Sequence, residues 1–165
     1  MLYGHVETVA HRIDHLRRLR ELQDETHGFT ALVPFAYEPD NNKLSHLGLG
    51  RASAFEDLRT LAIARLYLDN FDHITAYWVS LGLPTAQIAL SFGVDDLHGT
   101  IQQERIFHMA GSKTPQGQQV AALERAIREA ARIPMQRNTF YQRINARKVE
   151  GEILPDTPKK TEVLA

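Results

Sequence analysis

The chain opens with Met1-Leu2-Tyr3-Gly4-His5-Val6-Glu7, a strand-like segment that leads directly into an amphipathic helix. Thr8 is the expected N-cap of this helix, which we place over residues 9–25 because apolar residues recur there at spacings of three and four. His5 and Glu7 therefore stand where a strand ends and a helix begins, the junction at which parallel strand–helix folds carry their functional groups. Because the chain starts at this junction, we expect it to be the second half of a larger protein.

Strand and helix signals alternate along the rest of the chain. Short apolar runs predict further strands over residues 29–33, 74–79 and 89–94. Ser53 and Thr100 each begin a capping-box pattern, and the helix after Ser53 is expected to run to about residue 70. Pro84 suits the first turn of a short helix, and Thr114 is expected to open a final helix.

Four strand–helix units in succession indicate a parallel α/β fold. A complete (βα)8 barrel of the TIM type needs about 250 residues, so four units correspond to half of one. We therefore expect half of a (βα)8 barrel over residues 1–112, a C-terminal helical extension over residues 113–147 and a disordered tail over residues 148–165. A small open sheet with helices on both faces is the alternative, and periodicity alone does not separate the two.

The composition is that of an ordinary globular domain. With 165 residues, 43% of them hydrophobic, the chain is long enough to bury a core. The formal net charge of -1 argues against a general affinity for nucleic acid. The sequence has no apolar run of about 18 residues, which argues against a membrane span, and no secretory signal, so we expect a cytoplasmic location. It also has no cysteine, which excludes disulfides and thiolate ligands within this chain.

His5 and Glu7 are the candidate catalytic residues. They are two positions apart, so on a strand both side chains point to the same face, which at a strand end could be the mouth of a barrel. The competing interpretation is a loop pair that is hydrogen-bonded to the backbone, and spacing alone favours it. His11 and His15 lie four apart on the first helix, but they face away from its apolar side, so no metal site is predicted there.

Other polar and aromatic residues follow the later strands. Glu38 comes after the second strand, where a solvated loop carboxylate is the simpler interpretation. Tyr77 and Trp78 alternate on the expected third strand, so one would face the helices and the other the barrel interior. Asp95 follows the expected fourth strand and precedes the helix start at Thr100, although aspartate is also common in turns.

Several of these segments together resemble a known family. The first are Tyr3-Gly4-His5-Val6-Glu7-Thr8, Leu19-Arg20-Glu21-Leu22-Gln23-Asp24-Glu25-Thr26, Pro34-Phe35-Ala36-Tyr37-Glu38-Pro39, Asp57-Leu58-Arg59-Thr60 and Leu68-Asp69-Asn70-Phe71. In this order they resemble the C-terminal half of the radical S-adenosylmethionine enzymes of menaquinone and deazaflavin synthesis. Within that family, the aminofutalosine synthases of the futalosine route are most similar to Ala76-Tyr77-Trp78-Val79, Phe92-Gly93-Val94-Asp95-Asp96-Leu97 and His108-Met109-Ala110-Gly111.

The resemblance covers about residues 1–145 and implies a transferase reaction in the complete enzyme. A 4Fe–4S iron–sulfur cluster cleaves S-adenosylmethionine, and the adenosyl radical adds to a carboxyvinyloxybenzoate. The sister enzymes are cyclic dehypoxanthine futalosine synthase and the deazaflavin synthase component. The resemblance identifies these motifs, and the roles of single residues are hypotheses based on their places near strand ends. We expect His5 and Glu7 to orient substrate or cofactor groups. The expected substrate- or cofactor-binding residues are Tyr3, Glu38, Tyr77, Trp78, Asp95 and Thr100.

The chain departs from the family in one large respect. The family holds its cluster through a three-cysteine motif in the N-terminal half, and this chain has no cysteine. We therefore expect the chain alone to be inactive and to assemble with a missing N-terminal half or with copies of itself around a small-molecule substrate. Two alternative functions remain: a non-catalytic half-barrel, and a metal hydrolase that uses His5, Glu7 and Asp95 as ligands. The hydrolase needs three or four converging ligands, and only His5 and Glu7 converge by spacing.

Overall fold

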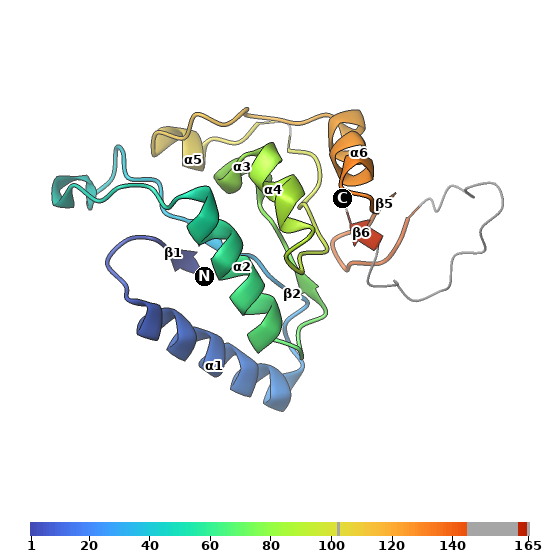
Figure 1. Cartoon of the computed structure of the whole chain (residues 1–165), viewed down its shortest axis with the longest axis horizontal. Coiled ribbons are helices and arrows are strands. Elements are labelled where there is room, and N and C mark those ends of the chain that lie inside the picture. The colour runs from blue at the N-terminus through green and yellow to red at the C-terminus, as the bar shows by residue number, and fades with distance from the viewer. Residues whose placement is uncertain (102, 145–161, 165) are drawn as a thin grey trace.

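A computed structural model describes residues 1–101 and 103–144 and a short strand at Glu162–Leu164. Most of the expected tail, and residues 145–147 of the expected helical extension, lie outside the described residues. The remainder of the chain forms a mixed arrangement of helices and short strands (Figure 1).

The first strands pair in parallel and in the order of the chain. Strand β1 (Leu2–Tyr3) pairs with β3 (Phe35–Ala36), and β2 (Ala31–Leu32) pairs with β4 (His73–Ile74). A further parallel bridge joins Thr75 to Asp96. Consecutive segments of the chain are therefore neighbours with the same direction, as in a series of strand–helix units. The described residues do not contain a closed barrel.

The helices occupy the connections between these strands. Their bounds are Val9–Thr26 for α1, Ser45–Leu47 for the 3-10 turn η1, Ala54–Tyr67 for α2, Trp78–Leu81 for α3, Leu83–Ala89 for α4, Ile106–Met109 for α5 and Val120–Glu129 for α6. A parallel pair, β5 (Ile133–Met135) with β6 (Glu162–Leu164), follows α6. Figure 1 shows α1 and α2 side by side, and an ion pair from Arg12 to Glu56 joins them.

The predicted helix starts at Thr8, Ser53 and Pro84 are confirmed. The Thr8 hydroxyl accepts the His11 N–H at the start of α1, and the Ser53 hydroxyl accepts the Glu56 N–H at the start of α2. Pro84 lies in the first turn of α4. The apolar sides of these helices cover one side of the strands and form a common core, whose largest fully buried members include Leu16, Leu61, Leu68, Phe71, Ile74, Trp78, Leu97 and Leu123.

Two predicted strands are wrong. The strand expected over residues 74–79 ends at Ile74, and the backbone turns at Tyr77 so that Trp78 begins the helix α3. Residues 89–94 continue the turns of α4, because Ser91 N–H donates to Ile88 O and Phe92 N–H donates to Ala89 O. Gly93 then adopts a left-handed φ of 91°, which ends the turn, and the fourth extended segment begins only near Asp95 and Asp96.

The two last predicted helix starts are also wrong. In the described residues, the helix after Thr100 is α5, which begins only at Ile106 and whose first N–H groups bond to the Glu104 carboxylate. The final helix α6 begins at Val120 and not at Thr114. The Thr114 hydroxyl donates to the carbonyl of Val79, so this residue ties its loop to α3. The error at Thr114 arises because capping residues also form loop hydrogen bonds.

Candidate functional site

The carboxyl ends of the parallel strands carry loops whose aromatic side chains touch one another. His5, after β1, packs edge-on against Tyr37, after β3, with ring centroids 5.9 Å apart. Tyr77, after β4, packs edge-on against His98, which follows the fourth segment, at 4.9 Å. Residues that are distant in sequence thus meet at one edge of the strands, as expected for a parallel arrangement.

Glu7 is held as a fixed anion in the first of these loops. Its carboxylate accepts the Gly4 N–H at 2.6 Å and the His5 N–H at 2.9 Å, and the Arg12 guanidinium lies 2.7 Å away. Burial opposes the charge, but these donors outweigh it and lower the pKa of Glu7 to about 2. This is the backbone-bonded arrangement that spacing alone favoured.

His5 keeps one ring nitrogen free for a ligand. Its Nδ1 accepts the Val6 N–H at 2.7 Å, so in the neutral ring the proton is on Nε2. The described residues give Nε2 no hydrogen-bond partner, and the side chain is 19% exposed. His5 can therefore donate one hydrogen bond to a bound molecule, whereas Glu7 fixes the loop that carries it.

Tyr3 and Trp78 lie in the core and not at this edge. Tyr3 is fully buried, and its hydroxyl donates to Asp57 of α2 at 2.7 Å. Burial and the Asp57 carboxylate raise the pKa of Tyr3 above its ordinary value. Trp78 is also fully buried, and its indole N–H donates to Gly99 O at 2.9 Å. The structure therefore gives both side chains internal partners.

Asp95 lies at the opposite ends of the strands, where β4 begins. Its carboxylate accepts the Ile74 N–H at 2.8 Å and lies 2.6 Å from His73 Nδ1 and 3.1 Å from the Arg65 guanidinium. Because β4 begins at His73, this cluster lies away from the loops that carry His5 and Tyr77. The structure thus separates Asp95 from the other predicted site residues.

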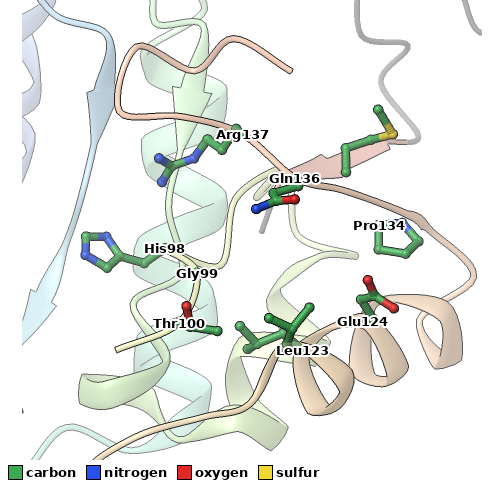
Figure 2. A pocket seen from close by; sticks show the side chains of 10 residues that line it. His98, Gly99, Thr100, Leu123, Glu124, Pro134, Gln136 and Arg137 are labelled. Carbon is green, nitrogen blue, oxygen red and sulfur yellow. The ribbon is translucent and has the colours of Figure 1, made fainter. Parts of the chain in front are cut away.

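Thr100 lines a polar cavity of about 260 Å³ beside the fourth segment. Figure 2 shows His98, Gly99 and Thr100 on one wall, with Leu123 and Glu124 of α6 and the segment around Gln136 on the others. Arg137 also lines this cavity, but its guanidinium is bound to Asp96, with two N–O distances of 2.9 Å.

A larger apolar pocket of about 480 Å³ lies next to the carboxyl ends of β1 and β3. Three rings form one wall: Phe35 and Tyr77 lie 5.2 Å apart, and Phe107 lies 5.9 Å from Phe35 and 5.6 Å from Tyr77. Leu2, half exposed, lies on the same wall because it pairs with Phe35. The pocket is therefore shaped for an apolar, ring-sized group.

Glu38 supplies the polar side of this pocket. Burial raises the pKa of Glu38, although Arg51 lies 3.0 Å away and opposes the shift. Arg51 also donates to Ser80 O, which fixes the guanidinium beside the carboxylate. Glu38 and Tyr77 were predicted from the sequence, whereas Phe35, Phe107 and Arg51 were not. The segment Pro34-Phe35-Ala36-Tyr37-Glu38 could have indicated Phe35 as a site residue. Phe35 and Tyr37 are two positions apart, so on a strand they point to the same face directly before the loop.

The part of the chain that the structure describes has no group of three or more His, Asp or Glu residues placed to hold a metal ion. The ligand set His5, Glu7 and Asp95 is not assembled, because Asp95 lies at the other end of the strands. Among the described helices, none combines the length and apolarity needed to cross a membrane.

Residues 26–150 match the family model of the CofH/MqnC C-terminal region. The chain belongs to this family. It is 51% identical over 147 residues to an aminodeoxyfutalosine synthase of Thermus thermophilus. It is 46% identical over 143 residues to a 5-amino-6-(D-ribitylamino)uracil--L-tyrosine 4-hydroxyphenyl transferase of Methanoculleus marisnigri, and 42% identical over 144 residues to a cyclic dehypoxanthine futalosine synthase of Streptomyces coelicolor.

These matches cover 86–87% of this chain but only 39%, 39% and 35% of the three relatives, respectively. The chain thus spans well under half the length of the proteins it matches. The predicted family resemblance is confirmed, and the three relatives carry three different enzyme names. Membership of the CofH/MqnC C-terminal region therefore relates the chain to enzymes without selecting one reaction.

Proposed function

We propose that the chain is the C-terminal portion of an aminodeoxyfutalosine synthase, a transferase of menaquinone synthesis. The complete enzyme would add the adenosyl radical of S-adenosylmethionine to a carboxyvinyloxybenzoate. The observation that carries this choice is the 51% identity to the Thermus thermophilus enzyme, against 46% and 42% for the sister enzymes. The half-barrel fold is part of the same proposal, and the parallel strand order supports it.

The apolar pocket supports an aromatic substrate. The rings of Phe35, Tyr77 and Phe107 provide edge and face contacts for a benzoate ring and exclude water from it. Arg51, beside Glu38, supplies positive charge near a substrate carboxylate, and His5 supplies one N–H donor. In this proposal the chain binds and orients the substrate for attack.

The iron–sulfur cluster does not fit the residues of this chain. A cluster is held by cysteine thiolates, and the sequence has none. The cluster, which supplies the electron that cleaves S-adenosylmethionine, would therefore be carried by the N-terminal half of the enzyme. We propose that this half is the partner of the chain, with self-association as the other possibility for the isolated chain.

The runner-up function is a sister enzyme that acts on tyrosine, as in the name of the Methanoculleus marisnigri relative. A phenol ring also fits a pocket walled by Phe35, Tyr77 and Phe107, so ring shape alone does not choose between the substrates. The non-catalytic half-barrel is a third possibility.

The deciding experiment joins this chain to the N-terminal portion of the Thermus thermophilus relative and assays the hybrid with each family substrate. Aminodeoxyfutalosine formation from the carboxyvinyloxybenzoate is expected, with none from tyrosine. Tyr77→Leu should reduce the rate at least about tenfold by removing a ring contact. The matched control is Phe55→Leu, because Phe55 is 73% exposed on α2 and lies outside the pocket. Turnover of tyrosine instead would favour the sister enzyme.

A further inference from the structure

The short helix α5 forms part of the wall of the apolar pocket. Ile106, Phe107 and Ala110 all line the pocket, and Phe107 contacts both Phe35 and Tyr77. A helix of four residues has little stability of its own, because nucleation is costly and it gains few internal hydrogen bonds. Its position must therefore be set by side chains around it.

Glu104 holds the start of α5. The side chain is 8% exposed, and its two oxygens accept the Ile106 N–H at 2.8 Å and the Phe107 N–H at 3.0 Å. Its own N–H donates to Gln116 O at 3.0 Å, which ties it to the far side of the loop. A carboxylate that accepts two backbone N–H groups is favoured in its ionised form.

His108 holds the end of α5 through both ring nitrogens. Nε2 lies 2.6 Å from the carbonyl oxygen of Thr114, which can only accept, so Nε2 carries a proton. Nδ1 lies 3.0 Å from Glu104 Oε2, which is an ionised acceptor, so Nδ1 carries a proton as well. The two bonds together require the imidazolium form. Thr114 is in turn anchored by its hydroxyl, which donates to Val79 O at 2.7 Å.

We propose that Glu104 and His108 form a charged clasp that positions Phe107 against the ring pocket, so that ring binding weakens when the clasp opens. His108 is a positioning residue and does not touch the ligand. The inference rests on the proposed aromatic site and extends it by assigning residues that set the shape of that site. Loss of the His108 proton removes one of the two bonds and frees the end of α5.

The surroundings of His108 favour its charged form. The Thr114 carbonyl and then the Glu104 carboxylate raise the pKa of His108 above its ordinary value. Glu38, on the loop after β3, is the other charged group that faces it, and Arg51 and Asp40 lie beside Glu38. Because the folded pKa of His108 is raised and that of Glu104 is lowered, the clasp is complete between pH 4.5 and pH 6.5, and it is lost as the pH rises through the His108 pKa.

Two measurements on the full chain test the clasp. Nitrogen NMR of the imidazole should show both ring nitrogens of His108 protonated at pH values below 6.5, the ordinary pKa of histidine, whereas a neutral tautomer there would overturn the inference. Binding of fluorobenzene, a neutral ring probe, should weaken about tenfold as the pH rises through the His108 pKa. A pH-independent affinity in the wild-type chain would also overturn it.

Substitutions distinguish the effect of the clasp on ring binding from the effect of the pocket itself. His108→Gln and Glu104→Gln should bind fluorobenzene about tenfold more weakly at low pH and lose the pH dependence. His15→Gln is the matched control, because the side chain of this exposed histidine on α1 has no hydrogen bond in the described residues and should keep the wild-type profile. Variants that keep wild-type affinity would refute the clasp. No binding by any chain, with both His108 nitrogens protonated, would refute the ring pocket and leave the clasp as a purely structural device.

Discussion

At the scale of single residues, Glu7 shows how a predicted catalytic group can be structural. Its side chain is 11% exposed, and it accepts two backbone N–H groups and the Arg12 guanidinium. The sequence places it at a strand end, which suits catalysis, but its bonding capacity is largely used within the loop. We still propose His5 and Glu7 for the site, with His5 donating to the ligand and Glu7 fixing the loop.

Glu7→Gln should destabilise the chain by about 2 kcal/mol at neutral pH, because a charged acceptor of several bonds is lost. The folded pKa of about 2 is below the ordinary value of 4.5, so this stabilisation is present above pH 4.5 and is lost as the pH falls toward 2. Urea unfolding at several pH values would measure it. Glu25→Gln, on the exposed end of α1, is the control and should change little; equal stability of both variants would contradict the prediction.

Asp96 is a second residue whose role is visible only in three dimensions. It is fully buried, and it binds Arg137 through both oxygens and accepts the Thr75 hydroxyl at 2.6 Å. Tyr141 stacks on His73, with centroids 4.3 Å apart, and also contacts the Arg137 guanidinium. These contacts hold Arg137 and Tyr141, in the segment after β5, against the paired residues Thr75 and Asp96.

Asp96→Asn should cost about 3 kcal/mol or more, since it leaves the Arg137 charge buried without its partner. Arg137→Met in the same chain should recover part of this loss, because the unpaired charge is then removed. Urea unfolding of the single and double variants gives the coupling energy. Asp72→Asn, on an exposed loop, is the control; a cost for Asp96→Asn no larger than for this control would show that the pair is not stabilising.

At the scale of elements, local signals predicted the starts of the two longest helices, although the capping signals at Thr100 and Thr114 failed. The helices α1 and α2 have side-chain caps at Thr8 and Ser53, and these act within three residues. The apolar run at residues 74–79 has no such signal, and a short apolar run fits a strand or a buried helix equally well. The Gly82 N–H donates to the Trp78 carbonyl at 2.8 Å and closes a helical turn there, a bond that forms only once the chain is packed.

The same limit applies to the candidate site. His5 and Glu38 were predicted to follow strands, and both lie at this edge. Tyr77 was predicted within a strand, and it reaches the edge because β4 ends at Ile74. Tyr3 could not be separated from them, because its direction depends on the turn at Gly4, where φ is 89°. Phe107 joins the site through a loop that is 30 residues beyond Tyr77, and no spacing rule connects two such positions.

Gly93→Ala tests the end of the α4 turns. A Cβ at this position would lie 2.5 Å from Cγ of Arg65, and φ is 91°, which L-residues rarely adopt. The substitution should cost at least about 1 kcal/mol and disturb the Arg65–Asp95 pair. Gly50→Ala is the matched control, since Gly50 has open space around it and no positive φ. Thermal unfolding of the two variants compares them, and equal melting temperatures would contradict the prediction.

At the scale of the whole molecule, the chain alone should not perform radical chemistry. It offers no cysteine, and a 4Fe–4S cluster is held by cysteine thiolates. After anaerobic reconstitution and desalting, we expect no iron–sulfur absorbance and no cleavage of S-adenosylmethionine. The hybrid with an N-terminal portion is the positive control. Stoichiometric iron retained by the chain alone would require ligands that its described residues do not assemble.

The strand arrangement leads to a prediction about assembly. Within the described residues, β1 pairs with β3 on one side only, and the segment at Asp96 pairs only with the β4 side. Unpaired strand edges are templates for other chains, and Leu2 at the first edge is half exposed on an apolar wall. We therefore expect the isolated chain to be oligomeric or poorly soluble, and to become a defined complex when an N-terminal half is supplied. Sedimentation of both samples measures this. A stable monomer of the chain alone with a cooperative melt would show that both edges are tolerated in water, and the need for a partner would then rest on catalysis alone.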